Sequence, residues 1–375
     1  MKDAINKVFD VTKNPYLRLV VVLFLFLLGL KLMTVSFMNF GDEFTQHIIV
    51  EYTQKPINGL FIGILATAIT QSSSLTTSIV VGLVATGFFS DIRTAVPIII
   101  GTNIGTSVTS SIVSLAHIGQ KDEFPKAFSA GTLHDFFNVI AILIILPLEL
   151  YFGILSNTAT FLYDSLFTNV NVASNVESSK WSLSAILKSI SYFLYNILWS
   201  NAAISLILAF IMLFFSLRNL STILKTIVFN GDKKERFQQR MFGSSLGTLF
   251  WGIGLTAFVQ SSSITTALTV PLVATNVISL RKAFPFIMGA NIGTTLTALI
   301  ASLSTPNEAS ITIALCHVLY NSAAVFIFML VPLIQSIPIS LSTKLGQLVN
   351  YRKWYGFAYV GGLFFGIPML LMYFS

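Results

Sequence analysis

The chain has 375 residues, of which 54% are hydrophobic and 10% are charged, and its mean hydropathy is +0.80. A soluble domain carries roughly 25% charged residues, so the composition excludes an ordinary soluble enzyme and predicts a protein that crosses a membrane several times. The net charge of +7 fits basic loops at a membrane surface better than a nucleic-acid site. The single cysteine, Cys316, excludes a disulfide within this chain and a metal site built on cysteine clusters.

Apolar stretches with the length of a bilayer span, about 20 residues, recur along the chain. The first is expected at residues 16–38 and is interpreted as an uncleaved helix, because no small-residue cleavage site ends it. The other uninterrupted spans are expected at residues 94–116, 125–152, 186–217, 284–303, 309–334 and 354–374.

Two further apolar segments, residues 57–90 and 246–279, are each interrupted by Gln-Ser-Ser-Ser, at Gln71 and at Gln260. Each arm beside the interruption is shorter than a membrane span. A bilayer tolerates such a segment only where its open backbone faces protein or a water-filled cavity. The pattern therefore predicts two re-entrant helical hairpins in an all-α integral membrane protein.

The distribution of positive charge predicts the orientation. With a cytoplasmic N-terminus, most of the 22 Lys and Arg residues lie on the inner side of the membrane, as the positive-inside rule requires. This threading places the polar loop 153–185 outside and the basic loop 218–241 inside. The C-terminus then lies outside if the last helix spans fully.

Three motifs recur in the same order in the two halves of the chain. They pair Gln71-Ser-Ser-Ser-Leu-Thr-Thr with Gln260-Ser-Ser-Ser-Ile-Thr-Thr, Gly101-Thr-Asn-Ile-Gly-Thr-Ser with Gly289-Ala-Asn-Ile-Gly-Thr-Thr, and His134 and Asn138 with His317 and Asn321. In the predicted threading the two halves enter the membrane from opposite faces, which makes an inverted repeat. Inverted repeats with broken helices near the midplane are typical of secondary transporters, whose substrate binds at the repeat interface.

These features divide the chain into five parts. Residues 1–55 hold the N-terminal segment and the first span, residues 56–152 the first repeat and residues 244–334 the second. Residues 153–243 join the repeats through the external loop, a connecting helix and the basic cytoplasmic loop. Residues 335–375 are expected to form a C-terminal loop and the last span.

The interrupted segments offer groups that bind ions. Serine hydroxyls and glutamine amides can donate and accept hydrogen bonds, and backbone N–H groups at a helix start attract anions such as phosphate. Free carbonyl groups at the opposite helix ends suit Na⁺. Runs of small residues often serve only to pack helices closely, but their duplication at two helix breaks favours a binding site.

Other polar residues within the spans have two interpretations. Asn103 and Asn291 either kink a helix or form a second layer of ligands, and their repetition favours ligands. Asp135 either caps a helix near the membrane surface or binds a coupling cation. His134 and Asn138, with their counterparts in the second half, are expected to make interhelical hydrogen bonds.

Charged residues at the ends of the spans are expected to position the helices in the membrane rather than to bind ions. Glu149 is interpreted as a carboxylate at the membrane interface, and Arg93 and Arg281 as anchors of topology rather than anion attractors. The sequence contains no Walker motif, so ATP is not expected as the energy source. We expect no enzyme activity, no cofactor and no nucleic-acid partner.

The motifs taken together resemble those of a known family. The duplicated Gln-Ser-Ser-Ser, the following Gly-x-Asn-Ile-Gly-Thr, and His134-Asp-Phe-Phe-Asn138 ahead of Leu146-Pro-Leu-Glu149 are similar to the type II sodium-dependent phosphate symporters. The resemblance covers residues 59–332. It implies uptake of inorganic phosphate driven by sodium, the coupling ion, through alternating access. The short loop 153–185 has no cysteine pair and suggests a compact bacterial member in the inner membrane.

The resemblance also implies the residues of the two kinds of site. The phosphate site would be formed by Gln71, Ser72, Ser73, Ser74, Gln260, Ser261, Ser262, Ser263, Asn103 and Asn291. The sodium sites would be formed by Gln71, Ser74, Thr76, Thr77, Gln260, Ser263, Thr265, Thr266 and Asp135.

Competing interpretations remain open from the sequence. The hydroxyl and amide groups do not exclude a sodium-coupled transporter of another small anion, such as sulfate or arsenate. A passive anion channel is a further alternative, whereas a membrane scaffold has no need of polar breaks at the midplane. The sequence allows either a monomer or a homodimer.

Overall fold

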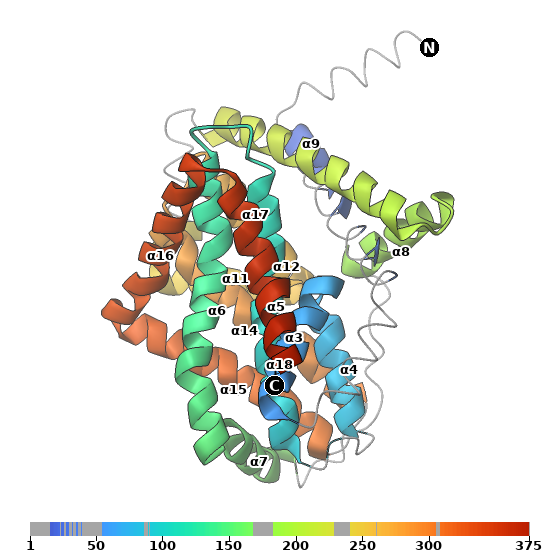
Figure 1. Ribbon diagram of the computed structural model, residues 1–375, viewed down its shortest axis with the longest axis vertical. Coiled ribbons are helices and arrows are strands. Elements are labelled where there is room, and N and C mark those ends of the chain that lie inside the picture. The colour runs from blue at the N-terminus through green and yellow to red at the C-terminus, as the bar shows by residue number, and fades with distance from the viewer. Residues whose placement is uncertain are drawn as a thin grey trace.

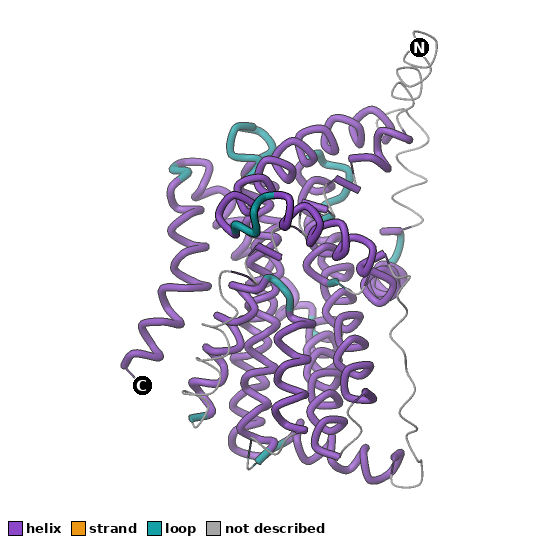
Figure 2. The backbone as a smooth tube through the Cα atoms, turned by 90° about the vertical axis from the view of Figure 1, so that its right-hand side faces the viewer, coloured by secondary structure: helices purple, strands orange, loops and turns teal. Residues whose placement is uncertain are grey.

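The computed structural model describes residues 55–85, 89, 91–167, 183–228, 241–259, 261–304 and 308–374, together with scattered positions between 16 and 39. Its described elements are all helices, joined by short loops (Figures 1 and 2). The expected span at residues 16–38 lies mostly outside the described residues. Within the described part, the all-α fold predicted from the sequence is confirmed.

A close helix pair forms the core of the first half. Helix α3 (Pro56–Thr70) packs along α5 (Ile92–Leu115). Both run in the same direction, because Gly59 lies beside Thr94 and Gly105 lies beside Thr67. A Cβ atom at Gly63 would overlap the carbonyl oxygen of Ile98, and one at Gly101 would overlap that of Leu60. Helices at such short range need glycine at the contact. Helix α4 (Ser73–Ala85) follows α3 and packs on α5 as well.

The second half repeats this pairing residue for residue. Helix α11 (Ser245–Val259) runs in the same direction as α14 (Leu280–Ser304), because Gly289 lies beside Leu249 and Gly293 lies beside Thr256. A Cβ atom at Gly252 would overlap the carbonyl oxygen of Phe286, and one at Gly289 would overlap that of Leu249. The short helices α12 (Ser262–Ala267) and α13 (Thr269–Ala274) then take the place that α4 has in the first half.

The long helices α5 and α14 run in opposite directions. Residues Ala274–Asn276, which precede α14, line one pocket with residues of the α5–α6 connection, at the end of α5. The last turn of α14 lies at the other end, where Ser310 Oγ donates to Ser302 O at 3.5 Å. There Ala309, in the first turn of α15 (Glu308–Leu330), lines a pocket with Asp91 and Ile92 at the start of α5.

Four segments are long and apolar enough to cross a membrane, counted over the described residues. They are α5, α6 (Phe124–Phe152), α15, and residues Trp354–Phe374, where α17 (Trp354–Gly361), a π-helical turn (Gly362–Gly366) and α18 (Ile367–Phe374) follow one another. An aromatic cluster joins the halves: the Phe137 ring of α6 contacts Phe284 of α14 and Phe328 of α15, with centroids 5.7 and 4.8 Å away.

One of the expected membrane spans is wrong. The single span at residues 186–217 is instead two helices, α8 (Leu183–Ile197) and α9 (Ala202–Val228), because Trp199 and Ser200 adopt positive φ angles of 56° and 53°. Asn201 then accepts a hydrogen bond from Ile204 N at 3.0 Å and starts the new helix. Figure 1 shows α9 lying across one end of the molecule, at a steep angle to α6.

Two segments expected as loops are largely helical in their described residues. Much of the loop 335–353 belongs to α16 (Pro332–Tyr351), which packs on α6 where Gly346 meets Pro125 and Ser129. The expected external loop 153–185 begins with α7 (Ile154–Phe167). Hydrophobicity does not reveal these two helix starts. Proline favours the start of α16, and the Glu149 carboxylate of α6 caps the start of α7.

Candidate functional site

The first Gln-Ser-Ser-Ser segment is a helix break, as its sequence predicts. Helix α3 ends at Thr70, Gln71 has a left-handed backbone with a φ of 52°, and α4 starts at Ser73. Thr70 Oγ1 lies 3.4 Å from Thr76 Oγ1 across the break. Thr109 Oγ1, on α5, donates to Gln71 Oε1 at 3.5 Å. The break is therefore bordered by hydroxyl groups and an amide, and it faces the polar side of α5.

The second segment also interrupts a helix. Helix α11 ends at Val259, and Gln260 lies outside the described residues. Ser261 has an extended backbone with a φ of −152°, and its hydroxyl accepts a hydrogen bond from Ile264 N at 3.4 Å at the start of α12. Both segments therefore place serine at the first turn of a helix inside the protein, where backbone N–H groups have no helical partner.

Side chains from the two segments reach the long helices. Ser110 Oγ of α5 lies 3.0 Å from Thr266 Oγ1 of α12, across the two halves. Ser262 Oγ donates to Thr294 Oγ1 of α14 at 3.3 Å. Helix α4 in turn packs against α14. Each broken segment therefore lies between the long helix of its own half and that of the other half.

Most of the expected site residues are buried despite their polarity. Ser72, Ser74 and Ser261 are half-buried. The fully buried members of the expected set are Gln71, Ser73, Thr76, Thr77, Asn103, Asp135, Ser262, Ser263, Thr265, Thr266 and Asn291. Such a dense buried set of hydroxyl and amide groups is costly in an apolar interior unless it has partners or ligands.

A hydrogen-bonded relay joins three of the long helices. His134 Nε2 of α6 donates to Asn291 Oδ1 of α14 at 2.6 Å, and Asn291 Nδ2 donates to Asn138 Oδ1 at 2.8 Å. Asn138 Nδ2 then donates to the carbonyl oxygen of Asn103, on α5, at 2.7 Å. The expectation of interhelical hydrogen bonds is confirmed for His134 and Asn138.

The same expectation is wrong for the counterparts in the second half. Asn321 Nδ2 donates to His317 O at 3.1 Å, within its own helix α15. Both ring nitrogens of His317 are buried without a hydrogen-bond partner among the described residues. The two halves therefore share these residues but not their hydrogen bonds.

The Asp135 carboxylate is fully buried in α6 and neither caps a helix end nor reaches the surface. Its Oδ2 accepts hydrogen bonds from Ser111 Oγ at 2.7 Å and Tyr359 Oη at 3.0 Å. Its Oδ1 has no hydrogen-bond partner among the described residues. An incompletely satisfied carboxylate inside a membrane segment is a candidate ligand for a cation. In the part of the chain described, no cluster of three His, Cys, Asp or Glu accompanies it.

Sequence reasoning missed several residues of this site. Thr109, Ser110 and Ser111 form a polar run on α5, which is a signal that the Gly and Asn motif obscured. Thr294 continues the equivalent polar run on α14. Tyr359 is one of three tyrosines in the last apolar span. It gives no local signal that sets it apart, because its partner Asp135 lies far away in sequence.

Glu149 lies in the last turn of α6, and its side chain is buried. Its Oε2 accepts hydrogen bonds from Leu155 N at 2.7 Å and Ser156 N at 3.3 Å. A carboxylate at the first turn of a helix satisfies free N–H groups and favours the helix start. Glu149 of α6 therefore caps α7.

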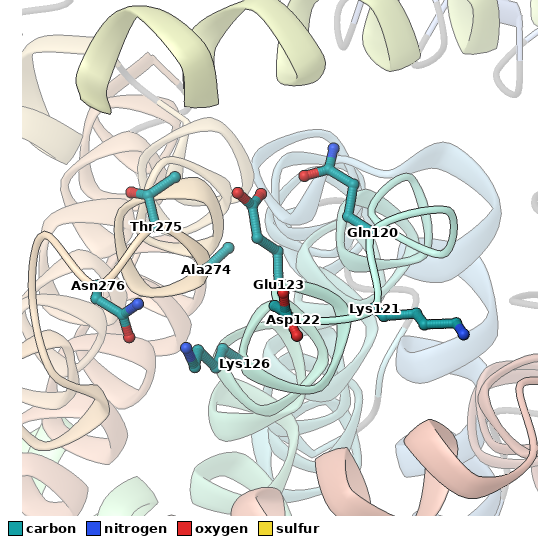
Figure 3. Close-up of a pocket in the computed structure, with 8 residues that line it drawn as sticks. All are labelled: Gln120, Lys121, Asp122, Glu123, Lys126, Ala274, Thr275 and Asn276. Carbon is teal, nitrogen blue, oxygen red and sulfur yellow. The ribbon is translucent and has the colours of Figure 1, made fainter. Parts of the chain in front are cut away.

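A pocket opens at each end of the helix bundle. At the end of α5, a cavity of about 230 Å³ separates Gln120–Lys126 from Ala274–Asn276 (Figure 3). At the opposite end, a cavity of about 430 Å³ is lined by Asp91, Arg93 and Asn157, among others. Arg93 Nη2 donates to Asn157 Oδ1 there at 2.9 Å. Neither pocket is lined by a residue of the Gln-Ser-Ser-Ser segments.

The fold and site define an α-helical membrane protein with two interrupted helices and a buried polar centre. The model of the family described as Na+/Pi-cotransporter matches residues 25–162 and 210–370. The chain belongs to this family. No solved structure matches it.

Curated relatives are similar over nearly the whole chain. The sheep (Ovis aries) "Sodium-dependent phosphate transport protein 2A" is 30% identical over 93% of the chain and 66% of the relative. The human (Homo sapiens) "Sodium-dependent phosphate transport protein 2B" is 27% identical over 92% of the chain and 63% of the relative. The chain thus spans somewhat less than two thirds of the length of the curated relatives it matches.

Proposed function

We propose that the chain is a secondary active symporter that couples inward sodium movement to the uptake of inorganic phosphate by alternating access. Family membership and the printed names of the relatives support sodium and phosphate as the transported ions. A location in the inner membrane, with a cytoplasmic N-terminus, remains a prediction from the positive-inside rule.

One observation carries the proposal more than any other. The glycine contacts of Gly63 and Gly101 on the first helix pair recur at Gly252 and Gly289 on the second, and the two pairs run in opposite directions. These relationships support an inverted repeat. Since α3 and α5 run in the same direction, α4 must return toward the side from which α3 came, which supports a re-entrant hairpin. Inverted repeats with broken helices are the architecture of alternating access.

The chemistry of the helix starts suits phosphate. The N-terminus of α4 carries Ser73 and Ser74, and the equivalent turn of the second half carries Ser262 and Ser263. Backbone N–H groups and serine hydroxyls at such positions bind phosphate without a fully charged side chain. The proposed phosphate ligands are Gln71, Ser72, Ser73, Ser74, Gln260, Ser261, Ser262, Ser263, Asn103 and Asn291.

Sodium would use the oxygen atoms nearby. Thr76 and Thr266 hydroxyls border the breaks, at 3.4 Å from Thr70 Oγ1 and 3.0 Å from Ser110 Oγ. Hydroxyl, amide and free carbonyl oxygens are suitable ligands for this cation. The proposed sodium ligands are Gln71, Ser74, Thr76, Thr77, Gln260, Ser263, Thr265, Thr266 and, at a separate position, Asp135.

Uptake into proteoliposomes tests the proposal. Purified protein is reconstituted and given radiolabelled phosphate under an inward sodium gradient or an equal potassium gradient. The expected result is transient accumulation above equilibrium with sodium only, abolished by Ser73→Leu or Ser262→Leu. Thr158→Val, an exposed position on α7, is the control and keeps uptake. Equal uptake in both salts would contradict the proposal.

The same preparation separates the alternatives. A transporter of another small anion would accumulate labelled sulfate or arsenate in preference to phosphate when sodium is present. A passive channel would let the anion equilibrate in either salt and never concentrate it.

A further inference from the structure

The side chains of His134, Asn291 and Asn138 form a complete hydrogen-bonded relay between helices, which we call the closed set. All three side chains are at most 1% exposed. The relay runs from α6 to α14 and back, and then to the backbone of α5 at Asn103, with donor–acceptor distances of 2.6, 2.8 and 2.7 Å. Through it, the first half holds the long helix of the second half.

The residues related to these by the repeat do not form such a relay, and we call them the open set. His317, Asn103 and Asn321 occupy the positions that correspond to His134, Asn291 and Asn138. Asn103 Nδ2 lies 3.3 and 3.5 Å from the carbonyl oxygens of Ile99 and Ile100, in its own helix. Asn321 Nδ2 likewise bonds within α15. In the closed set the asparagine amides donate hydrogen bonds to another helix. In the open set they donate to carbonyl oxygens of their own helix.

The open set leaves polar atoms buried without partners. Both ring nitrogens of His317 and the Oδ1 atom of Asn321 have no hydrogen-bond partner among the described residues. Both side chains are at most 1% exposed. Buried polar atoms without partners are unfavourable, so a conformation that pairs them would be favoured at this position.

The helices needed for that pairing are already in contact. Helix α15 packs against α5, as α6 packs against α14. Asn103 of α5 could therefore receive His317 in the way that Asn291 of α14 receives His134. Since the two long helices are related by the repeat, the closed and open sets have the same residues at equivalent positions and differ only in their hydrogen bonds.

We propose that His134 and His317 are positioning residues that engage in turn, one in each access state. In the conformation described here, His134 ties α6 to α14. In the opposite conformation, the His134 relay opens and His317 donates to Asn103, while Asn321 bridges to α14. The inference rests on the proposed function, because alternating access supplies the two conformations that the exchange requires.

Spin-label distances test the exchange. Asp122, in the α5–α6 connection, and Lys282, in the first turn of α14, are both exposed. Cysteines at these positions, in a Cys316→Ala background that removes the one native cysteine, report the separation of the two halves at one end. The distance distribution is measured by pulsed electron spin resonance in lipid nanodiscs.

The two histidines give opposite expectations. His134→Ala shifts the population away from the conformation described here, and His317→Ala shifts it toward this conformation, each by about five- to tenfold. The double variant returns close to the parent distribution. His134→Gln keeps an N–H donor and shifts less than His134→Ala. The control, Thr132→Val, changes a fully buried α6 hydroxyl bonded to its own helix at Phe128 O and causes no shift.

Two results would overturn the inference: shifts of the same sign for both histidines, or no shift for His317→Ala. If His134→Ala does not fold, His317→Ala alone decides, because a purely structural role predicts no shift for a side chain with no hydrogen bond to lose. Uptake is measured on the parent protein separately. Absent sodium-dependent uptake would refute the proposed function, whereas normal uptake with same-sign shifts would refute only the exchange.

Discussion

The Tyr359 hydroxyl donates to Asp135 Oδ2 at 3.0 Å and so joins the last membrane segment to the buried carboxylate of α6. Ser111 of α5 donates to the same oxygen at 2.7 Å. Both donors leave Oδ1 without a hydrogen-bond partner among the described residues. The carboxylate is thereby held in one orientation, and Oδ1 is the oxygen that we propose binds sodium.

Removing the tyrosine hydroxyl should weaken sodium activation. In Tyr359→Phe the aromatic contact with Phe128, at a centroid distance of 6.1 Å, can remain, but Asp135 loses a charge-assisted hydrogen bond worth about 1.5–3 kcal/mol. The expected result is a sodium concentration for half-maximal phosphate uptake raised by about tenfold. Tyr355→Phe, one turn earlier on α17, is the matched control. An unchanged sodium curve for Tyr359→Phe would contradict the role assigned to Asp135.

Glycine at the close helix contacts should stabilise the fold. In Gly252→Ala the new Cβ overlaps the Phe286 carbonyl oxygen, so α11 and α14 must separate, at a cost of about 1–3 kcal/mol. Gly254→Ala, on the same helix, meets nothing within 4 Å and should be neutral or stabilising by up to about 1 kcal/mol. Thermal unfolding in detergent measures both. Equal melting temperatures for the two variants would show that the packing of α11 on α14 differs from that described here.

A reversible cross-link between the halves should stop transport. The Ser110 and Thr266 hydroxyl oxygens are 3.0 Å apart, so Ser110→Cys with Thr266→Cys, in a Cys316→Ala background, can form a disulfide. Oxidation should abolish the phosphate uptake that the reduced double variant retains, and a reductant should restore uptake to that level, because the proposed alternating access requires the halves to move. Each single variant is treated identically as a control. Full uptake by protein shown to be cross-linked would mean that this contact does not open during transport.

The Glu149 cap predicts a graded effect on stability. Glu149→Gln keeps an oxygen that can accept from Leu155 N, whereas Glu149→Ala leaves the first turn of α7 without its cap. We expect Glu149→Ala to lower the free energy of unfolding by about 1–2 kcal/mol, and Glu149→Gln to lower it by less. Chemical unfolding followed by tryptophan fluorescence distinguishes them. The reverse order would exclude capping as the role of this side chain.

Local sequence patterns predicted some of these features well. The breaks at Gln71 and Ser261 and the long helices α5 and α14 follow from apolar runs and their polar interruptions. The wrong span at residues 186–217 has a different cause: the turn at Trp199 and Ser200 lies within a continuous apolar run, and hydrophobicity does not report a positive φ angle.

Other features could not be read from local patterns. The partnership of Tyr359 with Asp135 depends on how distant helices pack. The difference between His134 and His317 cannot be seen in two matching motifs, because it belongs to a conformation rather than to the sequence. The sequence repeat identifies the residues that the two halves share, and the structure shows that their hydrogen bonds differ.

The most direct test of the central proposal is reciprocal coupling. Proteoliposomes with equal sodium on both sides are given an inward phosphate gradient, and the entry of radiolabelled sodium is followed. A symporter must move sodium inward against its equilibrium as phosphate runs downhill, so we expect transient sodium accumulation that disappears without phosphate. Phosphate entry with no net sodium movement would contradict coupled transport and favour a passive pathway.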